Sequence, residues 1–181
     1  SQFTIEYTQR DAWLEQIKIL KQSLQGFDGA IYFEYAIPRM GKRIDVVLII
    51  SSALFVLEFK VGEKEFLAND VEQVWDYALD LKNFHETSHD HLIAPILVAT
   101  EGKDTVPVMS TTLHNDNLLI PVKTNKTLLS EVINGVLEFS NGEAIKPEIW
   151  QFGRYSPTPT IIEAAKALYA GHSVKDISRS D

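Results

Sequence analysis

Three ionisable residues stand in or beside the most apolar part of the sequence. Residues 42–62 read KRIDVVLIISSALFVLEFKVG, with Asp45 just ahead of one apolar run and Glu58 and Lys60 at the end of the next. Taking a charge out of water is costly unless the charge is paired or holds a metal ion. Two carboxylates and an ammonium group in a buried sheet therefore indicate a charge-paired or metal-binding site.

The elements that must position these residues are two neighbouring strands. The pattern predicts strands at 43–50 and 53–60, joined by a tight hairpin at Ser51 and Ser52. If the strands pair antiparallel, Asp45 comes near Glu58 and Lys60, which share one face because strand side chains alternate. Magnesium prefers carboxylate, carbonyl and water oxygens. The predicted ligands are the Asp45 and Glu58 carboxylates and the backbone carbonyl of Phe59, and the predicted metal is Mg²⁺ or Mn²⁺.

A helix predicted at 67–86 follows, with Asn69 as its expected cap. Its apolar residues recur at helical spacing, and Asp76 and Asp80 are expected on its exposed face. Gln73 and Tyr77 are four residues apart, so both can face the edge of the sheet.

The other elements complete an α/β pattern in which one mixed sheet is flanked by helices, in the order αβββαβ. Predicted helices lie at 8–26, 127–142 and, after a proline-bearing linker, within 154–172; predicted strands lie at 30–37, 92–100, 106–112 and 117–124.

Composition narrows the class of protein. The 181 residues include no Cys, so no disulfide can form, and no apolar run is long enough to cross a bilayer. We expect a soluble, cytoplasmic protein without a signal peptide. The net charge of -8 argues against a surface that coats nucleic acid, but it leaves room for a local basic patch.

Asp45, followed by twelve residues and then Glu58-Phe59-Lys60, resembles the signature of the PD-(D/E)XK nucleases. Ile44 departs from this signature, because many members carry proline there. Gln73 and Tyr77 match the Q-x-x-x-Y motif of the RecB-like branch. Residues 10–170 also resemble the N-terminal nuclease-like domain of bacterial nuclease–helicase fusion proteins.

This resemblance implies a restriction-endonuclease-like core and a role for each motif residue. Asp45 and Glu58 would bind Mg²⁺, and Lys60 would orient the attacking water and stabilise developing charge. Gln73 would orient the site, and Tyr77 would contact nucleic acid near the scissile phosphate. The implied activity is metal-dependent hydrolysis of DNA, favoured over RNA, in nucleic-acid processing or phage defence.

The resemblance also implies a division of the chain. Residues 1–153 would be the nuclease-like domain, and residues 154–181 would be a linker and short helix leading toward a helicase ATPase domain outside this sequence. We therefore expect the chain to be part of a larger protein.

For two sets of residues the sequence leaves two alternative roles open. A further acid of the site would be Glu34, on the strand before the basic turn, or Glu15, on the first helix. The basic residues Arg39, Lys42 and Arg43 would either grip backbone phosphates or form a solvated turn.

Two further alternatives concern a second metal site and the class of protein. His85, His89 and His91 could bind zinc, but no Cys is present and their spacing matches no known site, so we favour a helix end and a loop. The alternative to an enzyme is a catalytically inactive nuclease-fold module that binds nucleic acid or a partner protein.

Overall fold

The computed structural model of the protein describes residues 7–114 and 116–169. Five helices, one short 3-10 helix and five strands lie within these ranges. In chain order they are α1 (Gln9–Ser23), β1 (Ala30–Ile37), β2 (Lys42–Ile50), β3 (Ala53–Lys60), α2 (Ala68–Phe84), η1 (Glu86–Ser88), β4 (Leu92–Ala99), β5 (Val122–Thr124), α3 (Leu129–Phe139), α4 (Pro147–Trp150) and α5 (Pro159–Leu168).

The strands form one mixed sheet in the order β1-β2-β3-β4-β5. The first three strands are antiparallel neighbours, whereas β3, β4 and β5 run parallel. Ser51 adopts a left-handed backbone conformation with φ 53° in the predicted β2–β3 hairpin. The chain then crosses through α2 to reach β4, as a parallel pair requires. The predicted α/β class, with a mixed sheet flanked by helices, is confirmed.

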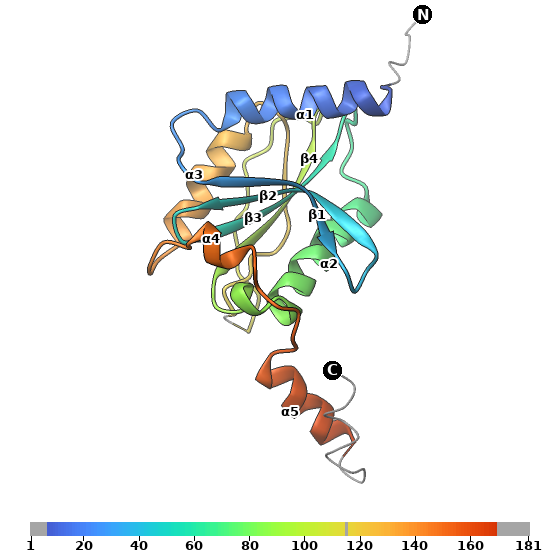
Figure 1. Ribbon diagram of the computed structural model, residues 1–181. Coiled ribbons are helices and arrows are strands. Elements are labelled where there is room, and N and C mark those ends of the chain that lie inside the picture. The colour runs from blue at the N-terminus through green and yellow to red at the C-terminus, as the bar shows by residue number, and fades with distance from the viewer. Residues whose placement is uncertain (1–6, 115, 170–181) are drawn as a thin grey trace, which may run out of the picture.

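Each face of the sheet is covered by helices because its strands are apolar on both sides (Figure 1). One core cluster packs Ile19 and Leu20 of α1 and several residues of α3 against the sheet. The other packs Val74, Ala78 and Leu81 of α2, together with Trp150 of α4, against the opposite face. All eight residues of β4 are buried, so this strand lies inside the sandwich.

The predictions after residue 100 are less accurate. No strand forms at 106–112, where Val106 and Val108 are 88% and 76% exposed. The last strand is limited to β5, because Pro121 lacks the N–H that a continuous ladder needs. Leu118 and Leu119 make only isolated bridges.

Two expectations for the ends and surface of α2 are wrong. Leu67, not Asn69, precedes the helix, and no side chain caps it. Asp76 is exposed as predicted, but Asp80 is 7% exposed. Asp80 is buried because it pairs with Arg39, which reaches over from the β1–β2 turn.

The chain after α4 leaves the sandwich along the end of α2. The backbone N–H groups of Ser156 and Thr158 donate to the carbonyls of Phe84 and Asn83. Beyond this point α5 projects away from the sheet (Figure 1). Across the described part of the chain, every helix is too short or too polar to span a membrane.

Candidate active site

The site begins with a distortion in β1 and β2. Phe33 pairs with Val46 and Tyr35 pairs with Ile44, so Glu34 lies opposite Asp45 in register without being its ladder partner. Glu34 has a left-handed backbone, with φ 51°. Non-glycine residues seldom adopt this conformation, and strained residues cluster at functional sites.

Asp45 takes the place of a backbone acceptor in the sheet. Regular pairing of β2 with β3 stops at Val46 and Leu57. One residue further on, Asp45 Oδ2 accepts a hydrogen bond of 2.9 Å from the backbone N–H of Phe59. The side chain thus continues the contact between the strands at the point where their backbones separate.

Glu58 brings a second carboxyl group beside Asp45. Its side chain is 5% exposed and hydrogen-bonded to Asp45. Burial and then the adjacent Asp45 raise the pKa of Glu58 far above its usual range, although Lys60 acts in the opposite direction. The Glu58 carboxyl group therefore holds a proton at neutral pH unless a cation takes its place.

Lys60 is linked to the middle of α2 through Gln73. Lys60 Nζ donates to Gln73 Oε1 at 3.4 Å, and Gln73 Nε2 donates to the Tyr77 hydroxyl at 3.1 Å. The Lys60 amine also lies 3.6 Å from a carboxylate oxygen of Asp70. The predicted motif residues Lys60, Gln73 and Tyr77 therefore form one polar chain beside Glu58.

Tyr77 supports this chain from inside the protein. Its side chain is 2% exposed, which leaves almost no surface for the predicted direct contact with nucleic acid. Burial, followed by the charges of Glu58 and Asp45, raises its pKa to about 12. The phenol therefore stays neutral, accepts from Gln73 and fixes the amide orientation.

Glu34 and Glu15, the alternative third acids, lie in different electrostatic environments. Glu34 contributes to raising the pKa values of both Glu58 and Tyr77, so it lies close enough to influence the carboxyl pair. Glu15 acts instead on Lys126. The geometry favours Glu34.

The basic turn is only partly available for phosphates. The Arg39 guanidinium lies 3.5 Å from Asp80 and 3.6 Å from the ring centroid of Phe84. Lys42 and Arg43 are exposed. Arg39 therefore holds the hairpin to α2, whereas Lys42 and Arg43 remain candidates for phosphate contacts.

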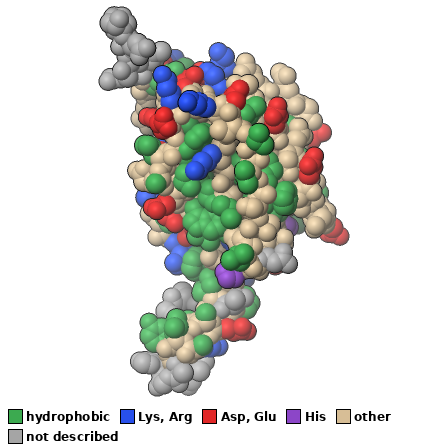
Figure 2. Space-filling view, turned by 180° about the vertical axis from the view of Figure 1, so that it is seen from behind, with side chains coloured by type: hydrophobic (Ala, Val, Ile, Leu, Met, Phe, Trp, Pro, Cys, Tyr) green, Lys and Arg blue, Asp and Glu red, His purple; other side chains and the backbone are tan. Residues whose placement is uncertain are grey.

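Figure 2 shows that the charged side chains on one whole face of the molecule are mixed in sign. Lys and Arg side chains lie among Asp and Glu, with no continuous basic stripe over the described residues on that face. On that face, contacts with a polyanion would therefore be local.

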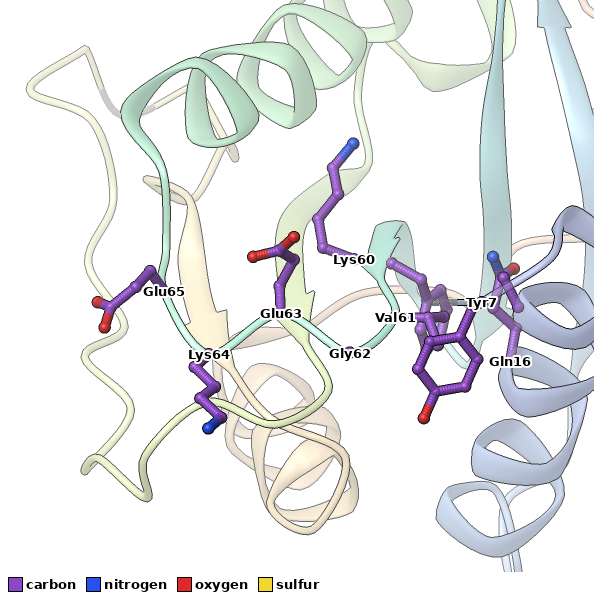
Figure 3. A pocket seen from close by; sticks show the side chains of 10 residues that line it. Tyr7, Gln16, Lys60, Val61, Gly62, Glu63, Lys64 and Glu65 are labelled. Atoms are coloured by element: carbon purple, nitrogen blue, oxygen red, sulfur yellow. The ribbon is translucent and has the colours of Figure 1, made fainter. Parts of the chain in front are cut away.

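An open pocket adjoins the carboxyl end of β3 (Figure 3). It has a volume of about 830 Å³ and includes Lys60 and Gly62 on one wall and Tyr7 and Gln16 on another. Ligands of α/β proteins commonly bind beyond the carboxyl ends of strands. The pocket gives the Lys60 region access to solvent.

The donor set fits a hard divalent cation. Glu58 Oε2 is buried and has no hydrogen-bond partner among the described residues. The N–H and C=O of one strand residue point to the same side, so the Phe59 carbonyl faces β2 together with the N–H that Asp45 accepts. Mg²⁺ is commonly held by one or two carboxylates, with waters and substrate phosphate completing its shell.

The described residues contain no group of three or more His, Asp or Glu side chains placed to hold a metal. In particular, the predicted alternative of a zinc site at His85, His89 and His91 gains no support. His85 is fully buried, bonded to Ser88 and packed against aromatic rings. Any cation at Asp45 and Glu58 would need oxygens from backbone, water or substrate.

Three residues beside the site were not predicted from the sequence: Tyr7, Gln16 and Asp70. Asp70 could have been found, because it lies three residues before Gln73 and so on the same helix face. Tyr7 and Gln16 had no such signal, because their position depends on how α1 packs against the end of β3.

Comparison of the chain with protein-family models, with curated proteins and with solved structures found no significant match.

Proposed function

We propose that this chain is a nuclease domain with a restriction-endonuclease-like core that hydrolyses phosphodiester bonds of DNA with Mg²⁺ or Mn²⁺. The observation that carries the proposal is the carboxyl pair of half-buried Asp45 and buried Glu58, next to the linked Lys60, Gln73 and Tyr77. The resemblance of these residues to the PD-(D/E)XK and Q-x-x-x-Y motifs supports it independently.

Asp45 and Glu58 would hold the cation, and Glu58 Oε2 has no hydrogen-bond partner among the described residues. A bound divalent cation supplies Lewis-acid stabilisation of the phosphate and lowers the pKa of an attached water. The positive charge of such a cation would favour the ionised form of Glu58, whose pKa is raised in its absence. A bound cation would therefore account for the burial of the Glu58 carboxyl group beside Asp45.

Lys60 provides a positive charge at the mouth of the site. Gln73 and Asp70 hold its amine on the α2 side, and its position beside the open pocket suits contact with a phosphate oxygen. A fixed cation of this kind stabilises charge that develops in the transition state. Tyr77 acts through Gln73 and orients the lysine.

The test is cleavage of single- and double-stranded DNA with Mg²⁺ or Mn²⁺. We expect Asp45→Asn and Lys60→Ala each to lower the rate at least about 100-fold, a typical loss when a charge-stabilising group is removed. Lys64→Ala is the matched control, because Lys64 lies in the same pocket wall but outside the polar chain. Equal cleavage by wild type, Asp45→Asn and Lys60→Ala would rule out this site.

The second candidate is an inactive module that binds nucleic acid or a partner protein. Two contacts favour it: Asp45 is engaged by the Phe59 N–H, and Lys60 is engaged by Asp70. DNA binding without cleavage under any metal condition would support this alternative over the enzyme.

A further inference from the structure

The wall of the pocket beyond β3 contains an aromatic ring held against backbone. A Cβ atom added to Gly62 would lie 2.9 Å from Tyr7 Cε2, so only glycine allows the ring to sit this close. Gly62 also has φ +82°, a conformation that L side chains rarely adopt. Glycine at position 62 thus leaves room for the ring beside the end of β3.

The Tyr7 ring keeps an open surface. It is 38% exposed and lines the 830 Å³ pocket together with Gln16 and Lys60. Known ligand pockets have volumes of roughly 300–1,000 Å³, enough for a nucleotide. A partly exposed aromatic ring in the wall of a pocket is suited to stacking against a nucleic-acid base.

The charges of the pocket favour a neutral group at this position. Lys60 and Lys64 are opposed by Glu63 and Glu65 in the same lining. These two carboxylates would repel a run of phosphates, whereas they would not repel an uncharged base. The aromatic surface, rather than the net charge, therefore defines the ligand.

Tyr7 and Lys60 lie on different sides of the end of β3. Figure 3 shows the Lys60 amine directed toward α2, with Tyr7 beside Gly62 and Val61 near α1. One nucleic-acid strand crossing this end could place a phosphate at Lys60 and a neighbouring base on Tyr7. Bases within a duplex have both faces covered by neighbouring pairs, so a base inside a strand that stacks on the ring would be unpaired.

We propose that Tyr7 and Gly62 form a stacking subsite for an unpaired base, so that the domain acts on single-stranded nucleic acid. This inference rests on the proposed nuclease function and specifies its substrate. The subsite contributes affinity for the base, whereas Lys60 acts on the phosphate.

The test uses the whole 181-residue chain and two short, labelled oligonucleotides of equal length, one with bases and one with abasic sugars throughout. Affinities are measured by fluorescence anisotropy with Ca²⁺ in place of Mg²⁺, and gels confirm that both strands stay intact. We expect Tyr7→Ala to weaken binding of the base-bearing strand by about 5- to 150-fold, the range for loss of one stacked base. Tyr7→Phe keeps the ring and should bind as wild type does.

Two controls distinguish loss of the stacking subsite from a general loss of nucleic-acid binding. The abasic strand should bind wild type and Tyr7→Ala equally. Phe139→Ala, which removes an aromatic ring of similar exposure on α3, should not change either affinity. Thermal unfolding verifies that each variant is folded.

Three results would overturn the inference. Unchanged affinity of Tyr7→Ala for the base-bearing strand, or equal weakening for both strands, would exclude a stacking subsite while leaving the nuclease proposal intact. Failure of folded wild type to bind either strand would instead count against nucleic acid as the substrate, and the subsite would fall with it.

Discussion

Ionisation of the Glu58 side chain opposes folding of the metal-free protein. Its pKa is raised in the folded protein from 4.5 to about 10, so the folded state holds more protons than the unfolded state between these pH values. Stability of the metal-free protein therefore falls as pH rises through this window. We predict that Glu58→Gln raises the melting temperature at pH 8 in a chelator, by roughly 2–4 °C for each 1 kcal/mol gained.

The same variant should have little effect at pH 4, where Glu58 is protonated in both states. Glu63→Gln, in the exposed loop, is the matched control and should not change the melting temperature at either pH. A Glu58→Gln protein that is less stable than wild type at pH 8 would show that the carboxylate is not the destabilising group.

Metal binding at the carboxyl pair should release the shared proton. We predict that the affinity for Mn²⁺ increases with pH between 6 and 8, up to about tenfold for each pH unit, because one proton competes with the ion. Isothermal titration calorimetry in two buffers of different ionisation enthalpy would count the released proton. A pH-independent affinity would contradict the shared-proton arrangement.

At the scale of elements, β1 and β2 show how the sheet is shaped around the site. The left-handed backbone of Glu34 is poorly tolerated by β-branched residues. We predict that Glu34→Val lowers the free energy of unfolding by about 1–3 kcal/mol, whereas Glu34→Gly does not. Ala36→Val, two residues away on the same exposed strand, is the control. Urea unfolding would distinguish these variants.

The sequence predicted the elements that carry a strong periodic signal. The helix with Trp13 and Leu20, the strands around Val47 and Phe55, and the carboxylate and lysine at the β3 end all follow from hydrophobic spacing. The left-handed backbone at Glu34 was not predicted, because no residue type there demands it. The loop around Val106 was misassigned because an apolar alternation can also occur on an exposed segment.

The sequence predicted which residues form the candidate site better than it predicted the contacts between them. Periodicity can place Gln73 and Tyr77 on one helix face, but it cannot show that Tyr77 is covered or that Asp70 approaches Lys60. These features depend on how α2 packs against the sheet. The burial of Asp80 was missed for the same reason, since its partner Arg39 is distant in sequence.

At the scale of the whole molecule, the segment around α4 is held to the end of α2 by a buried histidine. His85 bonds to Ser88 and packs against Trp150, and Trp150 Nε1 also donates to Ser88. Burial, followed by the nearby His89, lowers the pKa of His85 to about 4, with Glu86 acting in the opposite direction. The imidazole is therefore neutral in the folded protein at pH 7.

This arrangement predicts that the folded protein becomes less stable at acidic pH. Between pH 6.5 and about 4 the unfolded state binds the proton that folded His85 excludes, so stability is full above pH 6.5 and is lost as pH falls. The loss due to His85 should approach about 3 kcal/mol. We predict that His85→Gln, which can still form a hydrogen bond with Ser88, flattens this dependence in urea unfolding from pH 7 to 4. An unaltered pH profile in this variant would assign the acid sensitivity to other groups.

Asp45 accepts a hydrogen bond from the Phe59 N–H, so a substitution of Asp45 that tests its chemical role can also change the stability of the sheet. Asp45→Asn keeps an acceptor oxygen for that N–H, whereas Asp45→Ala orphans it, a change that costs about 1–3 kcal/mol for a buried donor. Failure of an alanine variant in the proposed cleavage assay could therefore result from lower stability alone. Only the amide replacement can separate what this aspartate contributes to reactivity from what it contributes to architecture.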